Sequence, residues 1–317
     1  MRARTIFLSV ASFIVLLSLS SCKNNQVNQA SLPLVTYSIS RNEDPWHRAL
    51  VKQLRANLPN DIDVFRFQMK SAEGNAVLQI NDLNTYLNEQ PKVLMVSPVG
   101  PQIEPALERA YKNGVPIVML DAKVGNRYTT FVGANNFNIG QEVAKYMGQQ
   151  LNGQGTILIM PGMMQSSMTQ DRIAGFNAIM KTAYPAIKVI VGPDSLYVLQ
   201  NAWVNMNLFL QTKQPFDAVF ALNDQMALGV AGALEAAATA EKLVVGIDCV
   251  SRTALKAIKD GKIDASFVNP LPGQKALELV VKVLNGEPVQ KEYTLPTMRV
   301  DAANVEQYAQ ENAYLVD

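Results

Sequence analysis

The clearest pattern of apolar and polar positions lies between residues 216 and 250. One apolar run ends at Asn223 and Asp224, apolar residues then recur at helical spacing, and a second run from Leu243 ends at Asp248. This order indicates a strand, a helix and a strand, with polar side chains where each strand ends. Small ligands bind beyond the carboxyl ends of strands in parallel α/β sheets, so Asn223 and Asp248 are expected to contact a ligand.

A second copy of this plan lies between Lys92 and Lys123. The apolar run 93–96 stops at Ser97, a helix follows, and a strand over 115–120 leads into Asp121. Both units therefore place a polar strand end ahead of a strand-terminal aspartate. This internal similarity predicts two related lobes whose polar strand ends face each other across a cleft.

The remaining chain continues the alternation of strands and helices. Further strands are expected at 34–39, 63–67, 129–132, 156–160, 187–191, 265–268 and 293–300, with helices from Pro45, at 72–87, 137–151, through Arg172 and Phe176, and at 199–210, 253–258, 275–284 and 304–310. The chain is expected to pass between lobes at Asn135 or Asn136. The two prolines within 269–272 preclude a regular element and mark a second crossing.

The helix that begins at Pro45 opens with residues that suit a ligand site. Asp44 is a plausible N-cap, and Trp46 and His47 then lie at the helix mouth beside the strand ends. The indole face of Trp46 could stack on a sugar ring, or it could close the edge of its lobe. His47 fits either the wall of the cleft or the surface.

The N-terminus has the pattern of a secretory signal. Arg2 and Arg4 precede an apolar segment at 6–17, which is short for a membrane span, and the sequence LSSC ends at Cys22. This resembles a bacterial lipobox, which implies a signal peptide over 1–21, lipid on the thiol of Cys22 and a polar tether over 22–31. The expected location is the cell envelope, anchored to a membrane. An ordinary signal peptide with an incidental cysteine is the alternative.

Composition narrows the function. The formal net charge is +1, and removal of the signal would leave 26 basic and 27 acidic residues, so a nucleic-acid partner is not expected. The glycines at 153 and 155 precede a strand, which does not fit a dinucleotide site. Cys249 fits a buried thiol better than a nucleophile, because the chain has one histidine. No cofactor, metal site or enzymatic activity is expected, although Asp121 and Asp248 could in principle act as acid and base.

Several stretches carry a family resemblance. LDAK, FALNDQMALG, VVGIDCV and NPLPGQKA, in this chain order, are similar to the ribose-binding-like (type I) periplasmic solute-binding proteins of bacterial sugar ABC importers. The resemblance covers the chain from about Leu34. It implies an α/β fold of two Rossmann-like three-layer lobes, with mainly parallel sheets joined by three hinge strands. The first lobe would comprise 32–134 plus 270–295, and the second 135–269 plus 296–317.

The resemblance also implies a set of ligand-binding residues. In the first lobe these are Ser38, Asp44, Trp46, His47, Ser97 and Asp121, and in the second Gln170, Tyr197, Asn223, Asp248 and Asn269. Strand-end Asp and Asn residues could instead bind loop amides or cap helices. Ribose binders have arginines where this chain has Ala122 and Gln170, so ribose is not the expected ligand. Lys123 and Arg172 are candidates to compensate, although Arg172 suits a role within its own lobe better.

The resemblance implies a substrate-binding lipoprotein of an ABC importer. It would be a monomer that captures a small neutral sugar or polyol by closing its hinge, and it would deliver that ligand to a permease and ATPase complex. The alternative is a receptor subunit that presents its ligand to a chemoreceptor or sensor kinase.

Overall fold

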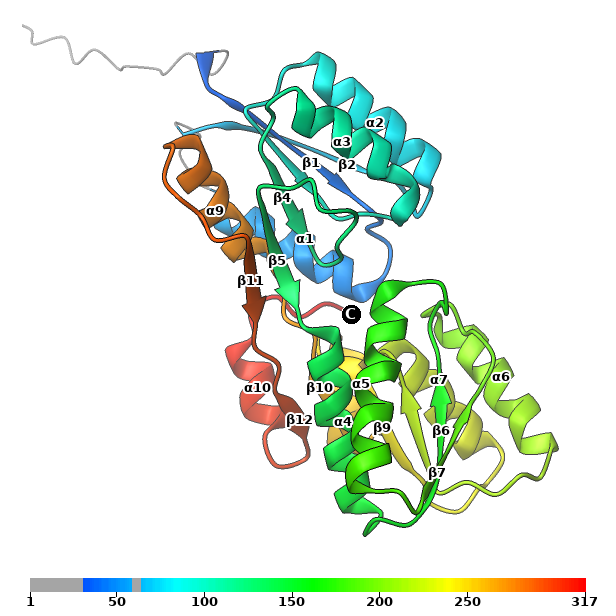
Figure 1. The fold of residues 1–317 in the computed structure, drawn as a ribbon. Coiled ribbons are helices and arrows are strands. Elements are labelled where there is room, and N and C mark those ends of the chain that lie inside the picture. Colours follow the sequence, from blue (N-terminus) through cyan, green and yellow to red (C-terminus); the bar gives the residue numbers. More distant parts are fainter. Residues whose placement is uncertain (1–30, 59–63) are drawn as a thin grey trace, which may run out of the picture.

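Two six-stranded sheets, one in each lobe, form the framework of the protein (Figure 1). The computed structural model describes residues 31–58 and 64–317. The first sheet has the order β11-β5-β4-β3-β1-β2, and every neighbouring pair is parallel. Its strands are β1 (Leu34–Ile39), β2 (Arg66–Ser71), β3 (Val93–Val96), β4 (Ile117–Leu120), β5 (Thr130–Ala134) and β11 (Glu292–Leu295).

Helices cover both faces of the first sheet. They are α1 (Pro45–Asn57), α2 (Ala76–Asn88), α3 (Glu104–Lys112) and α9 (Gly273–Leu284). Val93 and Met95 of β3 belong to a core with α1 and α9, whereas Leu94 and Val96 belong to a core with α2 and α3. Successive side chains of a strand point to opposite faces, so one buried strand supplies both cores.

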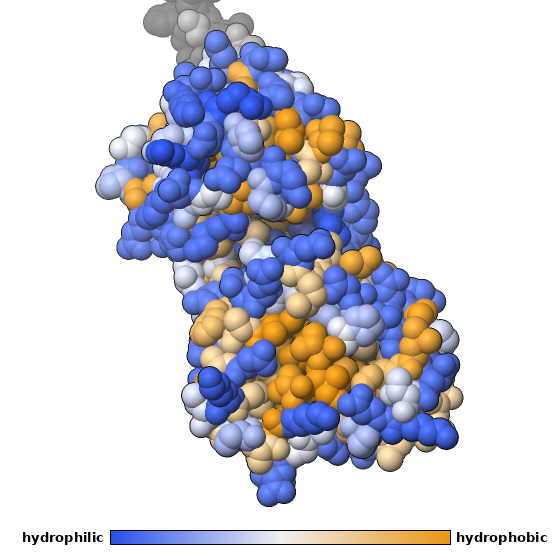
Figure 2. Space-filling view, turned by 45° about the vertical axis from the view of Figure 1, so that its right-hand side comes forward, coloured by the Kyte–Doolittle hydropathy of each residue, from blue (hydrophilic) through white to orange (hydrophobic). Residues whose placement is uncertain are grey.

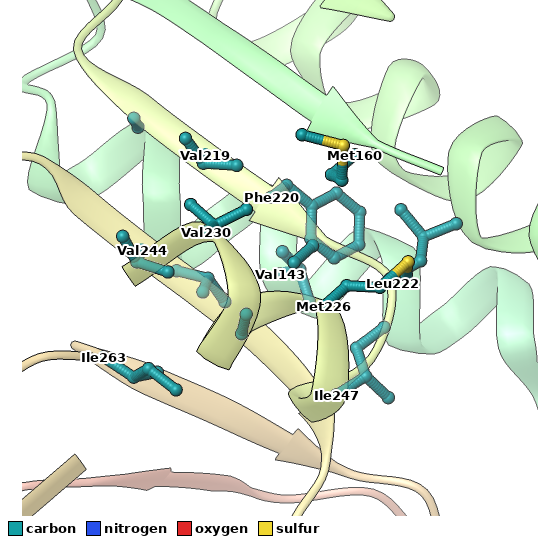
Figure 3. Packing of buried hydrophobic residues seen from close by; sticks show 14 of the residues in the cluster. Val143, Met160, Val219, Phe220, Leu222, Met226, Val230, Val244, Ile247 and Ile263 are labelled. Atoms are coloured by element: carbon teal, nitrogen blue, oxygen red, sulfur yellow. The ribbon is translucent and has the colours of Figure 1, made fainter. Parts of the chain in front are cut away.

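The second lobe repeats this plan, with order β12-β10-β9-β8-β6-β7 and one antiparallel pair, β10 with β12. Its strands are β6 (Gly155–Met160), β7 (Ile187–Val191), β8 (Ala218–Ala221), β9 (Leu243–Asp248), β10 (Ala265–Val268) and β12 (Arg299–Asp301). Its helices are α4 (Asn136–Gln150), α5 (Ser167–Ala183), α6 (Leu199–Gln211), α7 (Asp224–Ala236), α8 (Arg252–Lys259) and α10 (Val305–Glu311). Figure 3 shows Phe220 of β8 among Met160, Met226 and Val230 in the core of this lobe.

The chain crosses between the sheets three times: after β5, after β10, and between β11 and β12. The strand arrows of the two sheets point toward each other in Figure 1, so both sets of carboxyl ends meet where the lobes adjoin. This confirms the expected fold of two α/β lobes with mainly parallel sheets. Figure 2 shows hydrophobic residues gathered on one face of the second lobe. Separately, Trp203, Val204 and Leu208 of α6 are exposed.

Several expected boundaries are wrong. The single strand expected at 293–300 is two strands in different sheets, separated by a segment that begins at Pro296, which has no N–H for a ladder. The strand expected at 63–67 runs over Arg66–Ser71. The following helix begins at Ala76 because Glu73 and Gly74 take left-handed backbone conformations and Asn75 caps the helix.

The last residues of the chain contact both lobes. Leu315 packs in the core of the second lobe, and Val316 packs against the core of the first. Val316 also exchanges backbone hydrogen bonds with Val250 and Arg252, and Lys52 of α1 donates to the carbonyl of Leu315 at 2.9 Å. The expected placement of 296–317 wholly in the second lobe therefore does not hold for the C-terminal tail, residues 315–317, which contacts both lobes.

The expected signal peptide, the lipidation site at Cys22 and nearly all of the tether lie outside the described residues. Within the part that the structure covers, no helix combines the length and apolarity required to cross a bilayer.

Candidate ligand-binding site

Two aspartates end equivalent strands in the two lobes. Asp121 follows β4 and Asp248 ends β9, and their side chains are almost buried, at 9% and 8% exposure. Their backbones have φ values of 68° and 130°, which side-chain-bearing residues rarely adopt. Such conformations cost about 1–3 kcal/mol each and persist only where the surroundings impose them. Both strand ends are therefore built to hold a carboxylate in one place.

Asp224 supports the turn that carries Asp248. This buried side chain accepts hydrogen bonds from the backbone N–H of Cys249 at 2.8 Å and from the hydroxyl of Ser266 at 2.5 Å. Burial raises the pKa of Asp224 to about 7, although both hydrogen bonds lower it. Asp224 thus holds the backbone at Cys249, directly after Asp248, in place. Burial also raises the pKa of the Cys249 thiol, which is consistent with a packing role.

Asn223 and Tyr197 form the wall beside Asp248. Asn223 caps α7 by accepting from the N–H of Met226 at 2.9 Å, and its amide donates to the Tyr197 carbonyl at 3.3 Å. The Tyr197 hydroxyl lies 2.5 Å from the hydroxyl of Thr169, and its ring lies over Gly162, where any side chain would collide with it. Asn223 therefore caps a helix, and among the described residues its amide nitrogen has one hydrogen-bond partner, which leaves its second N–H for a ligand.

Arg172 is the buried cation of the second lobe, with 2% exposure. Its guanidinium donates to Asn136 Oδ1 at 2.8 Å and to the carbonyl of Leu222 at 2.6 Å, which ties α5 to α4 and to the end of β8. Burial raises the pKa values of both Asp121 and Asp248, and the charge of Arg172 lowers both. Because Asp121 belongs to the other lobe, the charge of Arg172 acts across the junction between the lobes, although burial has the larger effect on both carboxylates.

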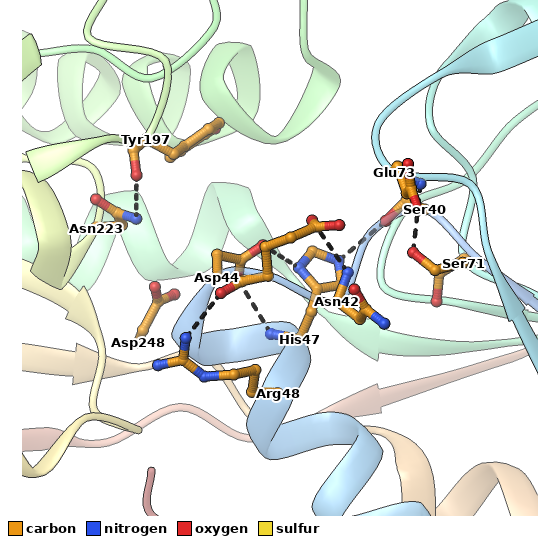
Figure 4. A network of polar contacts seen from close by, with 12 residues as sticks. Ser40, Asn42, Asp44, His47, Arg48, Ser71, Glu73, Tyr197, Asn223 and Asp248 are labelled. Carbon is orange, nitrogen blue, oxygen red and sulfur yellow. Dashed lines mark hydrogen bonds and ion pairs between the residues drawn. The ribbon is translucent and has the colours of Figure 1, made fainter. Parts of the chain in front are cut away.

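The opening of α1 supplies the polar groups of the first lobe (Figure 4). Asp44 caps α1 through the N–H of His47 at 3.1 Å, and its other carboxylate oxygen lies 2.6 Å from His47 Nδ1. The second ring nitrogen of His47 lies 3.0 Å from the hydroxyl of Ser40. Burial raises the pKa of Asp44, but the charge and hydrogen bonds of His47 outweigh it, so the pKa is lowered.

Figure 4 shows Asn223 and Asp248 across from Asp44 and His47, on the facing lobe. The charge of Asp44 also raises the pKa of Asp248. We refer to this set as the interlobe cluster; its members are Asp44, His47, Asp121, Arg172, Asn223 and Asp248.

Trp46 joins α1 to the second crossing between the lobes. Its side chain is 5% exposed, and its indole N–H donates to the backbone carbonyl of Asn269 at 2.9 Å. The side chain of Asn269 approaches Asp248 Oδ1 at 3.5 Å. The Trp46 ring packs in the core that α1 and α9 form with the first sheet. Its stacking on a ligand stays a prediction, as does the alternative in which it only closes the edge of its lobe.

Ser38 and Ser97 lie inside the first lobe and do not form its wall. Both are fully buried, and both bind Gln79 of α2, which donates to Ser38 Oγ at 3.3 Å and to the Ser97 carbonyl at 2.8 Å. Gln79 also accepts from the N–H of Val99 at 2.7 Å, and the Ser97 hydroxyl lies 2.7 Å from that of Tyr37. Gln79 is not among the residues expected from the sequence, although a polar residue between apolar helix positions is a usable signal.

The two candidates for a compensating cation, and Gln170, are engaged elsewhere. Lys123 forms an exposed ion pair with Glu292 at 3.0 Å, and Arg172 binds within its own lobe as described above. Gln170 is exposed, and its amide donates to the carbonyl of Met164 at 3.0 Å.

A surface cavity of about 630 Å³ lies along α1, and neither Asp121 nor Asp248 belongs to its lining. Its charged lining residues are all cationic, and two of them, Arg48 and Lys52, donate to carbonyls of the C-terminal tail. We assign the polar strand ends, and not this cavity, as the candidate site, because they offer both acceptors and donors. Among the described residues, no cluster of three or more His, Cys, Asp or Glu could hold a metal ion.

Comparison with known proteins defines the class. The chain matches the periplasmic binding protein domain over residues 35–288 and belongs to that family. It is 29% identical over 231 residues to the ribose import binding protein of Bacillus subtilis, covering 71% of this chain and 73% of the relative. It is 27% identical over 247 residues to the xylitol-binding protein of Mycolicibacterium smegmatis, covering 74% and 69%.

Solved structures agree with this assignment. The fructose-binding periplasmic domain of a hybrid two-component system superposes with a TM-score of 0.82 at 27% identity, covering 89% of this chain and 95% of that one. A solute-binding protein of an ABC transporter from Bacillus halodurans, with bound myo-inositol, has a TM-score of 0.81 at 26% identity and coverages of 88% and 97%. The family resemblance found in the sequence is confirmed.

Proposed function

We propose that this protein binds a small, uncharged, hydroxyl-rich ligand, a monosaccharide or polyol, between its lobes and delivers it to an ABC importer. One observation carries the proposal: Asp121 and Asp248 end equivalent strands of facing lobes, and the charge of Arg172 acts on both. The binding of ribose, xylitol and myo-inositol named for its relatives supports the ligand class.

The chemistry of the interlobe cluster suits such a ligand. Carboxylates accept hydrogen bonds from hydroxyls, and an amide can donate to and accept from neighbouring hydroxyls. Burial already disfavours charge on Asp121 and Asp248, so an uncharged guest fits better than an anion would. Because each lobe holds part of the contacts, ligand would stabilise the closed arrangement through its higher affinity for that state.

Anchoring and partners form the finer part of the proposal. The lipobox-like sequence at Cys22 supports a lipid anchor in the cell envelope, and the family supports a permease and ATPase complex as partners. The protein would act as a monomer without a cofactor. A binding role without turnover is supported by relatives that are binding proteins; recovery of unchanged sugar after prolonged incubation would test it.

A thermal-shift screen tests the proposed ligand class directly. Pentoses, hexoses, inositols and linear polyols would be compared, because a ligand that binds only the folded state raises Tm by mass action. Hits would be measured by calorimetry and by small-angle scattering with and without ligand. We expect a smaller radius of gyration with ligand. If no member of the panel binds, the ligand class is wrong, and a hit that leaves the radius unchanged contradicts the closure mechanism.

A receptor role is the second candidate, and one observation favours it. The fructose-binding domain with a TM-score of 0.82 belongs to a hybrid two-component system. Uptake of labelled ligand in cells that lack this protein, compared with the transcriptional response to the same ligand, separates the two roles. Lost uptake supports the importer, whereas a lost response with normal uptake supports the receptor.

A further inference from the structure

Arg41 lies near the carboxylates of the interlobe cluster and, in the part of the chain that the structure describes, forms no hydrogen bond or ion pair. Arg41 follows Ser40 at the carboxyl end of β1, and its side chain is partly buried. Within residues 31–58 and 64–317, its guanidinium makes neither a hydrogen bond nor an ion pair, whereas Lys123 and Arg172 are both engaged. An arginine that is free at a strand end is available to a ligand, because all five of its N–H groups are donors.

Gly74 positions this guanidinium. Nη2, Cζ and Nε of Arg41 lie 3.3, 3.7 and 3.9 Å from the point where a β-carbon on Gly74 would be, so the group rests against a residue with no side chain. Gly74 has a φ of 73°, and its N–H donates to the carbonyl of Ser40 at 2.8 Å. The turn after β2 is thus joined to the loop after β1, and both belong to the carboxyl edge of the first sheet.

The charge of Arg41 reaches the carboxylates of the first lobe. It lowers the pKa of Asp44 and that of Asp121, although burial is the largest influence on both and acts in the opposite direction. Arg41 nevertheless pairs with neither of them at ion-pair distance. The Arg41 guanidinium and the carboxylates of Asp44 and Asp121 therefore lie near each other in the first lobe, and no ion pair joins them.

We propose that Arg41 is a ligand-binding residue that donates hydrogen bonds to two adjacent oxygens of the ligand while Asp121 accepts from its hydroxyls. This rests on the proposed function and narrows the ligand to a polyol or sugar with a vicinal pair of oxygens. Each hydroxyl can then donate and accept, and the planar fork of an arginine matches two neighbouring oxygens. Arg41 would supply the guanidinium that Ala122 and Gln170 do not provide.

The test uses the best-binding sugar from the screen and calorimetry on Arg41→Ala and Arg41→Lys. Loss of hydrogen bonds from a charged group should weaken binding of that sugar roughly 10- to 100-fold in Arg41→Ala. Arg41→Lys should keep only part of the affinity, because an ammonium is a point charge without a fork. Arg55→Ala is the matched control; Arg55 is an exposed arginine in the last turn of α1, and its loss should leave affinity unchanged.

Deoxy analogues of the same sugar test direct contact. Removing one hydroxyl of the contacted pair should weaken binding to the wild type and have much less effect in Arg41→Ala, because the partner is already absent. The melting temperature without ligand should match that of the wild type in both Arg41 variants. If a sugar binds the wild type and both Arg41 variants equally well, the role of Arg41 is refuted and the proposed function stands. If no sugar binds the wild type, the proposed function itself fails.

Discussion

Helices α4 and α5 approach so closely that glycine is required on both. A β-carbon on Gly140 would lie 2.0 Å from the carbonyl oxygen of Arg172, and one on Gly175 would lie 1.9 Å from that of Phe137. Each glycine thus faces the backbone of the other helix. Gly140→Ala is expected to push the helices apart and to destabilise the second lobe.

The magnitude follows from the geometry. Relieving the contact at Gly140 requires a movement of about 1 Å, because nonbonded atoms repel steeply at shorter distances. Overpacking typically costs about 1–3 kcal/mol, and the upper end applies here because the obstacle is backbone and not a flexible side chain. If the free energy of unfolding of the second lobe falls by about 3 kcal/mol, Tm should fall by roughly 6–12 °C, as is typical of a domain of about 150–250 residues.

Thermal and urea unfolding, followed by circular dichroism without ligand, measure this effect. Gly232→Ala on α7 is the matched control, since its β-carbon would meet only Trp203 at an ordinary distance of 3.7 Å. That change should stabilise by about 0.5–1 kcal/mol, because alanine favours the helix over glycine. Equal stability of Gly140→Ala and Gly232→Ala would refute the close approach. Ligand affinity should also fall in Gly140→Ala, because α5 carries Arg172.

Three further outcomes are expected. The pKa of Asp224 is raised to about 7, so the folded state binds this proton more tightly than the unfolded state does. The proton therefore stabilises the fold fully below about pH 4, and this stabilisation is lost as the pH rises toward 7. In urea unfolding, Asp224→Asn should make the free energy of unfolding depend less steeply on pH over this range. Trp46→Phe should cost about 1 kcal/mol by removing the donor to Asn269, and denaturant midpoints equal to the wild type would contradict it. Leu315→Ala should cost about 2–5 kcal/mol in thermal unfolding if the tail packs as described, and an unchanged Tm would show that it does not.

Hydrophobic patterning was enough for most of the fold. Buried parallel strands appear as short apolar runs, and caps such as Asn223 mark where the next helix begins. The pattern failed at 293–300, because an extended segment looks the same whether it stays in one sheet or passes between two. Which sheet accepts its hydrogen bonds depends on strands that are distant in sequence.

The candidate site, like the fold, was predictable from the sequence only in part. Sequence spacing alone brought Asp121, Asn223 and Asp248 to strand ends, since the carboxyl edge of a parallel sheet gathers the residues that follow its strands. It did not decide which of these side chains bind other protein groups. Ser97 accepts from Gln79 inside the lobe, whereas Arg41 lies against Gly74 and has no hydrogen-bond partner among the described residues. A polar side chain binds whichever partner tertiary packing brings within reach, and that partner is set by elements far away along the chain.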